Sequence, residues 1–246
     1  MATIGPATES PEALERAILA GANVIRLNLS HGHVDDHVER LARVRAVAER
    51  LDLPIGVLAD LPGPKVRAGQ FPDGGVELST GERVSLRAGE GSSDADTIWV
   101  EYETLLTDID VGDRILLGDG SICMRVEKMT STSAEAVIET AGRVQGSPGV
   151  HLPSERLTLT TPTDEDLVLA ERMVAAGVEF LAVSFVRQAG DVQRMRDVVG
   201  TQVGLVAKIE TAAAIADLEG ILQVSDAIMV ARGDLGIDCP LEDLPH

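Results

Sequence analysis

The sequence predicts an α/β fold with a parallel sheet or barrel, interrupted once by an all-β module. Short apolar runs alternate with amphipathic stretches before residue 67 and again after residue 153. Such alternation is typical of parallel β/α units. Between those two points helical periodicity is almost absent. Short alternating runs there are separated by Gly, Asp and Ser, which is typical of a β domain.

Residues 1–66 are expected to hold the first three parallel strands. Ser10 precedes Pro11, which places an N-cap residue before a proline at the first helical position. The expected elements are a strand ending near residue 3, a helix over 11–20, a strand over 24–29, a helix over 34–51 and a strand over 55–59. Alternation along the second strand places Arg26 and Asn28 on one face.

Residues 67–153 are expected to form the inserted β domain, which follows the third strand. Its expected strands lie over 76–78, 83–86, 97–100, 113–117, 121–126 and 134–138. The β/α alternation then resumes in residues 154–246, where Thr163 is positioned to cap a helix. The expected elements of this part are a helix over 163–176, a strand over 180–185, a helix over 191–199, a strand over 204–209, a helix over 212–222 and a buried strand over 227–231 that ends in a turn.

The six strands of the α/β type leave two architectures open. A closed β/α barrel needs eight strands, so the chain is either an open sheet or an incomplete barrel. An incomplete barrel leaves parallel edges and apolar faces uncovered. That reading predicts an isolated chain that aggregates easily and is close to inactive.

The composition excludes several classes of partner. The formal net charge of −19 argues against nucleic acid, because phosphate backbones require clustered Lys and Arg. Cys123 and Cys239 lack CxxC or metal-ligand spacing, which fits a reducing compartment. No signal peptide and no apolar run of about 18 residues is seen, which predicts a cytoplasmic protein without a membrane span.

Charged residues follow two consecutive expected strands near the end of the chain. Lys208 and Glu210 follow the first, and Arg232 and Asp234 follow the second. The carboxyl ends of parallel strands share one face, where ligands bind. Two carboxylates and an ammonium there suit a divalent cation that holds an anionic oxygen substrate. The simpler alternative is that Lys208 pairs with Glu210 and that Asp234 caps a helix, although Gly233 would let the backbone approach a ligand.

Seven motifs in order resemble pyruvate kinase. They are TIGPAT at 3–8, VIRLNLSHG at 24–32, LADLPGPKVRAG at 58–69, PGVHLP at 148–153, FLAVSFVRQAGDV at 180–192, AKIE at 207–210 and SDAIMVARGDLGID at 225–238. The resemblance implies a (β/α)8 TIM-type barrel, with six of eight strands in this chain and a β lid domain inserted after strand three. It implies phosphoryl transfer from phosphoenolpyruvate to ADP, giving pyruvate and ATP in glycolysis. For the full-length form it implies a homotetramer.

The resemblance also implies roles for individual residues. Lys208 and Arg26 would be catalytic and would bind the substrate's phosphoryl group, while Glu210 and Asp234 would hold Mg²⁺ or Mn²⁺. The remaining substrate contacts would come from Ala231, Arg232, Gly233 and Asp234. The nucleotide contacts would come from Asn28, His31 and Arg67.

A monovalent-cation pocket is the point where the chain departs from the commoner family pattern. The pocket residues implied by the resemblance are Asn28, Ser30, Asp60 and Leu61. Lys65 stands where the family commonly has a glutamate, so its ammonium is expected to replace the bound K⁺ and to make the enzyme potassium-independent. The family's catalytic threonine and strands seven and eight would lie beyond residue 246.

Two other classes of function compete with this interpretation. A metal-dependent aldolase or lyase of pyruvate-like acids has a similar strand end but lacks the β insert and the Ser-His-Gly motif. A truncated barrel without catalysis is the non-enzyme alternative.

Overall fold

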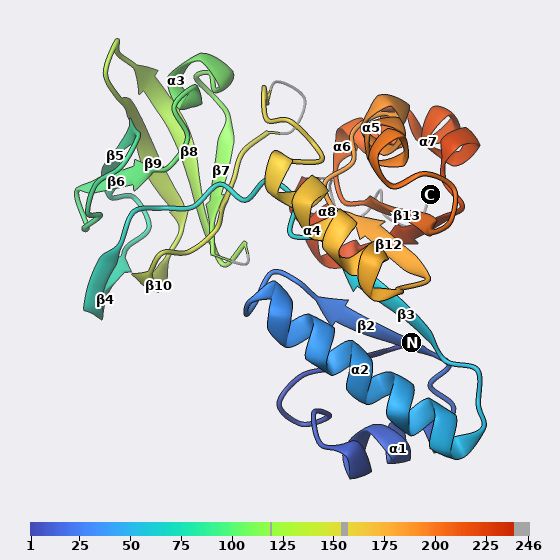
Figure 1. Ribbon diagram of the computed structural model, residues 1–246. Helices are drawn as coiled ribbons and strands as arrows, with labels where there is room; N and C mark the ends of the chain where they lie inside the picture. Colours follow the sequence, from blue (N-terminus) through green and yellow to red (C-terminus); the bar gives the residue numbers. More distant parts are fainter. Residues whose placement is uncertain (119, 154–156, 239–246) are drawn as a thin grey trace. The chain divides into compact units, whose positions relative to one another are not determined.

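A computed structural model describes residues 1–118, 120–153 and 157–238, which form two compact units (Figure 1). Unit 1 comprises Met1–Pro64 and Thr160–Arg232. Unit 2 comprises Lys65–Leu159 and the described residues from Gly233 onward. Within the described part of the chain, no helix combines the length and the apolar character that a membrane crossing requires.

Unit 1 is built on a six-stranded sheet in which every neighbouring pair of strands runs parallel. In sheet order the strands are β1 (Ala2–Thr3), β2 (Val24–Asn28), β3 (Gly56–Asp60), β12 (Phe180–Val183), β13 (Gly204–Ile209) and β14 (Ala227–Val230). The predicted α/β class with six parallel strands is therefore confirmed. The inner strands are apolar because both faces are covered, and Val57, Leu181 and Leu205 are fully buried.

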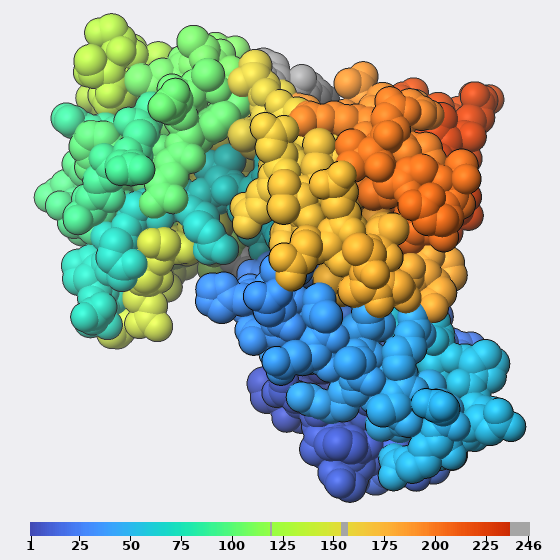
Figure 2. All heavy atoms as spheres, in the orientation of Figure 1, coloured from blue at the N-terminus to red at the C-terminus, as the bar shows by residue number. Residues whose placement is uncertain are grey.

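The helices of unit 1 connect successive strands and pack against one another in chain order. They are α1 (Pro11–Leu19), α2 (Val34–Leu51), α4 (Asp164–Ala176), α5 (Ala189–Val199), α6 (Ala212–Ala216) and α7 (Leu218–Val224). Contacts join α1 to α2, α2 to α4, α4 to α5 and α5 to α7. In Figure 2 the blue residues of α2 lie against the gold residues of α4 on the surface of this unit.

The two predicted N-caps are confirmed. The Ser10 hydroxyl accepts a hydrogen bond from the backbone N–H of Ala13 at 3.2 Å, at the start of α1. The Thr163 hydroxyl accepts from the N–H of Asp166 at 3.0 Å, at the start of α4. The Asp166 carboxylate in turn accepts from the N–H of Thr163 at 2.9 Å, which completes a capping box.

Three local expectations for the last strands and helices are wrong. The helix predicted over 212–222 is divided into α6 and α7 at Asp217, whose carboxylate instead accepts from the N–H of Ala189 at 2.8 Å. The turn expected after the last strand is the helix α8 (Arg232–Asp238). The last strand, β14, is not buried, because it pairs only with β13 among the described strands and leaves Val230 53% exposed.

Unit 2 is mostly β structure. Its strands are β4 (Phe71–Leu78), β5 (Arg83–Ala88), β6 (Thr97–Val100), β7 (Arg114–Leu117), β8 (Ile122–Met129), β9 (Ala134–Thr140), β10 (Gly142–Gly146) and β11 (Val150–His151). Six of them form a sheet in the order β11-β7-β8-β9-β5-β6, and β10 pairs with β4. Strands β10 and β11 and the short helix α3 (Leu105–Asp108) were not predicted, and because of this helix the description "all-β" is not fully correct.

Candidate functional site

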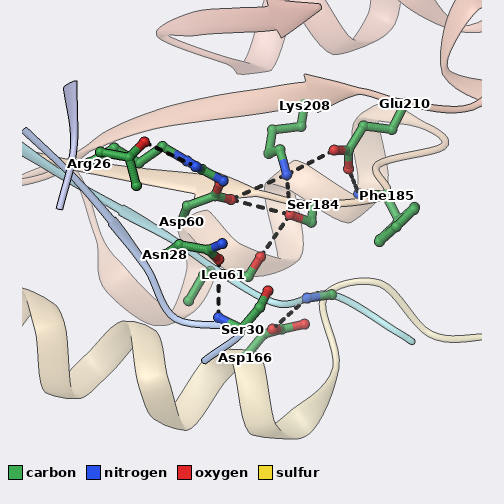
Figure 3. Close-up of polar contacts among 12 residues, drawn as sticks. Arg26, Asn28, Ser30, Asp60, Leu61, Asp166, Ser184, Phe185, Lys208 and Glu210 are labelled. Carbon is green, nitrogen blue, oxygen red and sulfur yellow. Dashed lines mark hydrogen bonds and ion pairs between the residues drawn. The ribbon is translucent and has the colours of Figure 1, made fainter. Parts of the chain in front are cut away.

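The candidate site lies at the carboxyl ends of β2, β3, β12 and β13 in unit 1 (Figure 3). Asp60 is the last residue of β3, and its Cα is paired with Asn28 on one side and Ala182 on the other. Lys208 lies one residue before the end of β13. Parallel pairing therefore brings side chains from four separate stretches of the chain to one rim.

Arg26 and Asp60 form an ion pair at this rim. The Arg26 Nε donates to Asp60 Oδ2 at 2.7 Å, and a second guanidinium nitrogen contacts the same oxygen. Arg26 Nη1 also donates to Thr3 Oγ1 at 3.2 Å. Asp60 is 1% exposed, so groups of the protein, and not water, must compensate its negative charge.

Lys208 is the centre of the site, because its ammonium meets three acceptors. Its Nζ lies 2.8 Å from Glu210 Oε1, 2.8 Å from Ser184 Oγ and 3.3 Å from Asp60 Oδ1. Burial by itself lowers the pKa of Lys208, but the carboxylates of Glu210 and Asp60 outweigh that effect and hold the pKa above its usual value. Lys208 therefore keeps its positive charge in a largely buried position.

Glu210 is held from two sides. It is 2% exposed, and while Oε1 accepts from Lys208, Oε2 accepts from the backbone N–H of Phe185 at 2.8 Å. Phe185 has a φ of 54°, a left-handed conformation that is costly for a bulky residue. The hydrogen bond to Glu210 helps to stabilise that conformation.

The segment after β3 is locked against the end of β12. The Leu61 N–H donates to Ala182 O at 3.0 Å, and the Leu61 carbonyl accepts from Ser184 Oγ at 2.7 Å. Gly63 has a φ of 70°, and a Cβ there would come within 2.9 Å of Ser184 Cβ and 2.8 Å of the Phe185 ring. Only glycine allows this close approach.

The structure places six of the sequence-predicted site residues together in unit 1. These are Arg26, Asn28, Asp60, Leu61, Lys208 and Glu210. Asn28 Oδ1 accepts from the N–H of Ser30 at 3.2 Å, so the predicted pocket residue Ser30 adjoins this group. The simpler alternative for Lys208 and Glu210 is also met, since the two side chains form an ion pair.

The structure also describes three other predicted residues of unit 1, which are His31, Ala231 and Arg232. His31 is exposed, and its carbonyl oxygen is 2.8 Å from His37 Nε2. The Ala231 N–H donates to Ile209 O at 3.2 Å, and Arg232 begins α8.

Four predicted residues belong to unit 2, so their roles in this site stay predictions. They are Lys65, Arg67, Gly233 and Asp234. Arg67 Nη1 donates to Ser147 O at 3.1 Å, and Lys65 is exposed. Asp234 lies in the first turn of α8.

Glu210 is suited to be one ligand of a divalent cation. Among the described residues there is no group of three or more His, Cys, Asp or Glu side chains that could hold a metal by themselves. Mg²⁺ is commonly held by one or two carboxylates, with water and substrate oxygens completing its shell. Oε1 of Glu210 contacts Lys208 Nζ and Oε2 accepts from the Phe185 N–H, and because a carboxylate oxygen can bind more than one partner, the donor chemistry suits Mg²⁺.

Ser184 was not among the predicted site residues, although it lies near the end of the strand expected over 180–185. The available signal was its position: the strand over 180–185 is expected between the strand over 55–59, which Asp60 follows, and the strand over 204–209, which contains Lys208. The contact of the Phe185 backbone N–H could not be predicted, because residue types do not indicate which backbone groups meet a site.

Comparison with known proteins agrees with the motifs. A family model described as "Pyruvate kinase, barrel domain" matches residues 1–246. The pyruvate kinase of Thermotoga maritima is 36% identical over 246 residues, which cover 99% of this chain and 53% of the relative. For the pyruvate kinase of Staphylococcus aureus strain MRSA252 the identity is 38% over 248 residues, covering 99% and 42%.

A third relative leads to the same family. The pyruvate kinase of Mycobacterium tuberculosis strain H37Rv is 36% identical over 246 residues, covering 99% of this chain and 52% of the relative. The chain spans about half the length of the curated relatives it matches. The family model covers the whole chain, and the parallel α/β unit carries the motifs at its strand ends. The chain therefore belongs to the pyruvate kinase family.

Proposed function

We propose that this chain forms the phosphoryl-transfer site of an enzyme that converts phosphoenolpyruvate and ADP to pyruvate and ATP. The observation that carries the proposal is the buried ammonium of Lys208, fixed between Glu210 and Asp60 at the strand ends. Phosphoryl transfer needs positioning and charge neutralisation more than covalent chemistry. A permanently charged ammonium on a rigid sheet supplies both.

Charge balance supports this assignment. Arg26 and Lys208 are cations, and Asp60 and Glu210 are anions, so the four side chains are neutral together. A phosphoryl group that enters this network can take over contacts that the carboxylates now make with the two cations. Lys208 would contact the transferring phosphoryl group, and Arg26 would orient its remaining oxygens.

A divalent cation is the cofactor in this proposal. Glu210 and Asp234 would hold Mg²⁺ or Mn²⁺, which when bound polarises the enolate and phosphoryl oxygens. The contribution of this chain is to orient the Glu210 carboxylate, through the N–H of Phe185 and the ammonium of Lys208.

The remaining contacts follow the sequence motifs. The proposed nucleotide contacts are Asn28, His31 and Arg67, and the proposed contacts with the substrate carboxylate are Ala231, Arg232 and Gly233. A cytoplasmic location and a homotetrameric full-length form also stay predictions.

We further propose that the pocket formed by Asn28, Ser30, Asp60 and Leu61 works without K⁺, because Lys65 supplies the charge. Two observations support an internally satisfied pocket: Asp60 is already paired with two cations, and the Leu61 carbonyl already accepts a hydrogen bond. If the Lys65 ammonium lies about 4 Å from the pocket, its repulsion of a second cation is on the order of 4 kcal/mol at an effective dielectric of about 20. That is enough to empty a weak monovalent site.

The deciding experiment is a coupled assay on the longest natural reading frame that contains this sequence. We expect pyruvate to form from phosphoenolpyruvate only when ADP and Mg²⁺ are both present, and a Lys208→Met variant to lose nearly all turnover. Cleavage of a hydroxy-diacid without turnover of phosphoenolpyruvate would instead support the aldolase or lyase alternative and would refute the proposal.

A further inference from the structure

We propose that Ser184 is a positioning residue that aims the ammonium of Lys208 at the transferring phosphoryl group. This inference rests on the proposed function. Ser184 follows β12, the strand between β3 and β13 in the sheet. Its hydroxyl therefore lies between Asp60, the last residue of β3, and Lys208, the next-to-last residue of β13 (Figure 3).

The direction of each hydrogen bond follows from chemistry. A lysine ammonium has three donors and no acceptor, so Ser184 Oγ must accept from Lys208 Nζ at 2.8 Å. The single hydroxyl hydrogen is then available for the Leu61 carbonyl at 2.7 Å, which is closer than Asp60 Oδ1 at 3.3 Å. The result is a series of two hydrogen bonds: Lys208 Nζ donates to Ser184 Oγ, and Ser184 Oγ donates to the Leu61 carbonyl.

The three contacts of the Lys208 ammonium differ in length. Glu210 and Ser184 both lie 2.8 Å from Nζ, whereas Asp60 lies 3.3 Å away. An incoming phosphoryl oxygen replaces the longest contact most easily. Glu210 and Ser184 then remain as the two supports that direct the third N–H toward the substrate.

The surroundings of Ser184 make that support rigid. Ser184 is 2% exposed, and the neighbouring Gly63 approaches its Cβ so closely that no side chain fits at residue 63. The Gly63 N–H is itself held by the buried Asp166 carboxylate at 3.0 Å. The hydroxyl therefore has little freedom to leave Lys208 and Leu61.

A purely structural role is the alternative, in which Ser184 only satisfies the Leu61 carbonyl. The test separates the two roles by measuring the reactivity of Lys208 directly, without substrate. The chain has three lysines, and Lys65 and Lys128 are exposed. Competitive acetylation followed by mass spectrometry therefore yields the rate at Lys208 relative to Lys128 within one sample.

Three variants are compared with the wild type. Ser184→Ala removes the hydroxyl, and Ser184→Cys keeps a side chain of similar size with a much weaker acceptor. Thr211→Ala is the matched control: its hydroxyl is also buried near the site, accepts from the Ala214 N–H at 3.0 Å and donates to Val186 O at 3.2 Å. Melting temperatures show that each variant is folded.

Both Ser184 variants should raise the relative acetylation rate of Lys208 by about tenfold or more, because a hydrogen bond to a charged group is lost. Thr211→Ala should leave it unchanged. In the phosphoenolpyruvate assay Ser184→Ala should lower kcat by about tenfold or more, with KM within about threefold of wild type.

An unchanged acetylation ratio in a folded Ser184 variant, or an equal rise in Thr211→Ala, would overturn the inference. Loss of phosphoenolpyruvate turnover in the wild type would instead refute the proposed function. The acetylation ratio would still decide whether Ser184 holds the ammonium.

Discussion

Replacement of Asp60 by asparagine is the sharpest test of the charge network. Asp60 is 1% exposed and pairs with Arg26 and Lys208, so Asp60→Asn leaves two cations without their shared anion. Removing one partner of a buried ion pair costs about 3–5 kcal/mol. The Arg26 side chain is 25% exposed and can regain water, which places the expected loss near the lower end, about 3 kcal/mol.

Thermal melting followed by the circular dichroism of the helices is the appropriate assay, because six of the eight described helices lie in unit 1. A loss of about 3 kcal/mol corresponds to a melting temperature about 6–12 °C lower for a unit of this size. Fluorescence of Trp99, the only tryptophan, follows unit 2 separately.

Asp35→Asn is the matched control. It removes the partner of Arg172 from an ion pair in which Asp35 is 79% exposed, and such pairs contribute less than about 1 kcal/mol. If Asp60→Asn lowered the melting temperature no more than Asp35→Asn does, the argument that Asp60 compensates buried positive charge would be refuted. A double-mutant cycle with Lys208→Met should also show a coupling above about 0.5 kcal/mol.

Three further predictions concern the metal, the monovalent cation and pH. Glu210→Ala and Asp234→Ala should each remove most Mn²⁺ binding in a titration, and unchanged affinity in both would contradict the metal assignment. The wild-type rate should be nearly equal in K⁺ and in a bulky organic cation, with Lys65→Glu creating a dependence on K⁺; a wild-type rate that collapses without K⁺ would exclude this role. The pKa of Asp226 is lowered by the hydrogen bond from the Leu205 N–H and by Arg196, so its contribution to stability is present above its usual pKa and is lost as the pH falls below it. Asp226→Asn should therefore flatten the loss of melting temperature as the pH falls below the usual pKa of an aspartate, 3.8, and an unchanged slope would contradict this.

The sequence by itself determined what depends on nearby residues. The helix over Val34–Leu51 and the strand over Gly204–Ile209 were predicted with their observed bounds, because apolar spacing within one element sets its type. The caps at Ser10 and Thr163 were predictable because their partners lie three residues away.

Tertiary structure decided what depends on residues far apart in the chain. At the helix break, the Asp217 carboxylate accepts from an N–H 28 residues away, and local spacing cannot reveal that contact. Ser184 meets Leu61 and Asp60 across 123 and 124 residues, so its place between Lys208 and the backbone became visible only once β12 lay between β3 and β13. Residue types at strand ends thus predicted a charged site, whereas the sheet order decided which charges meet and which hydroxyl connects them, because contacts between strands depend on pairing in space.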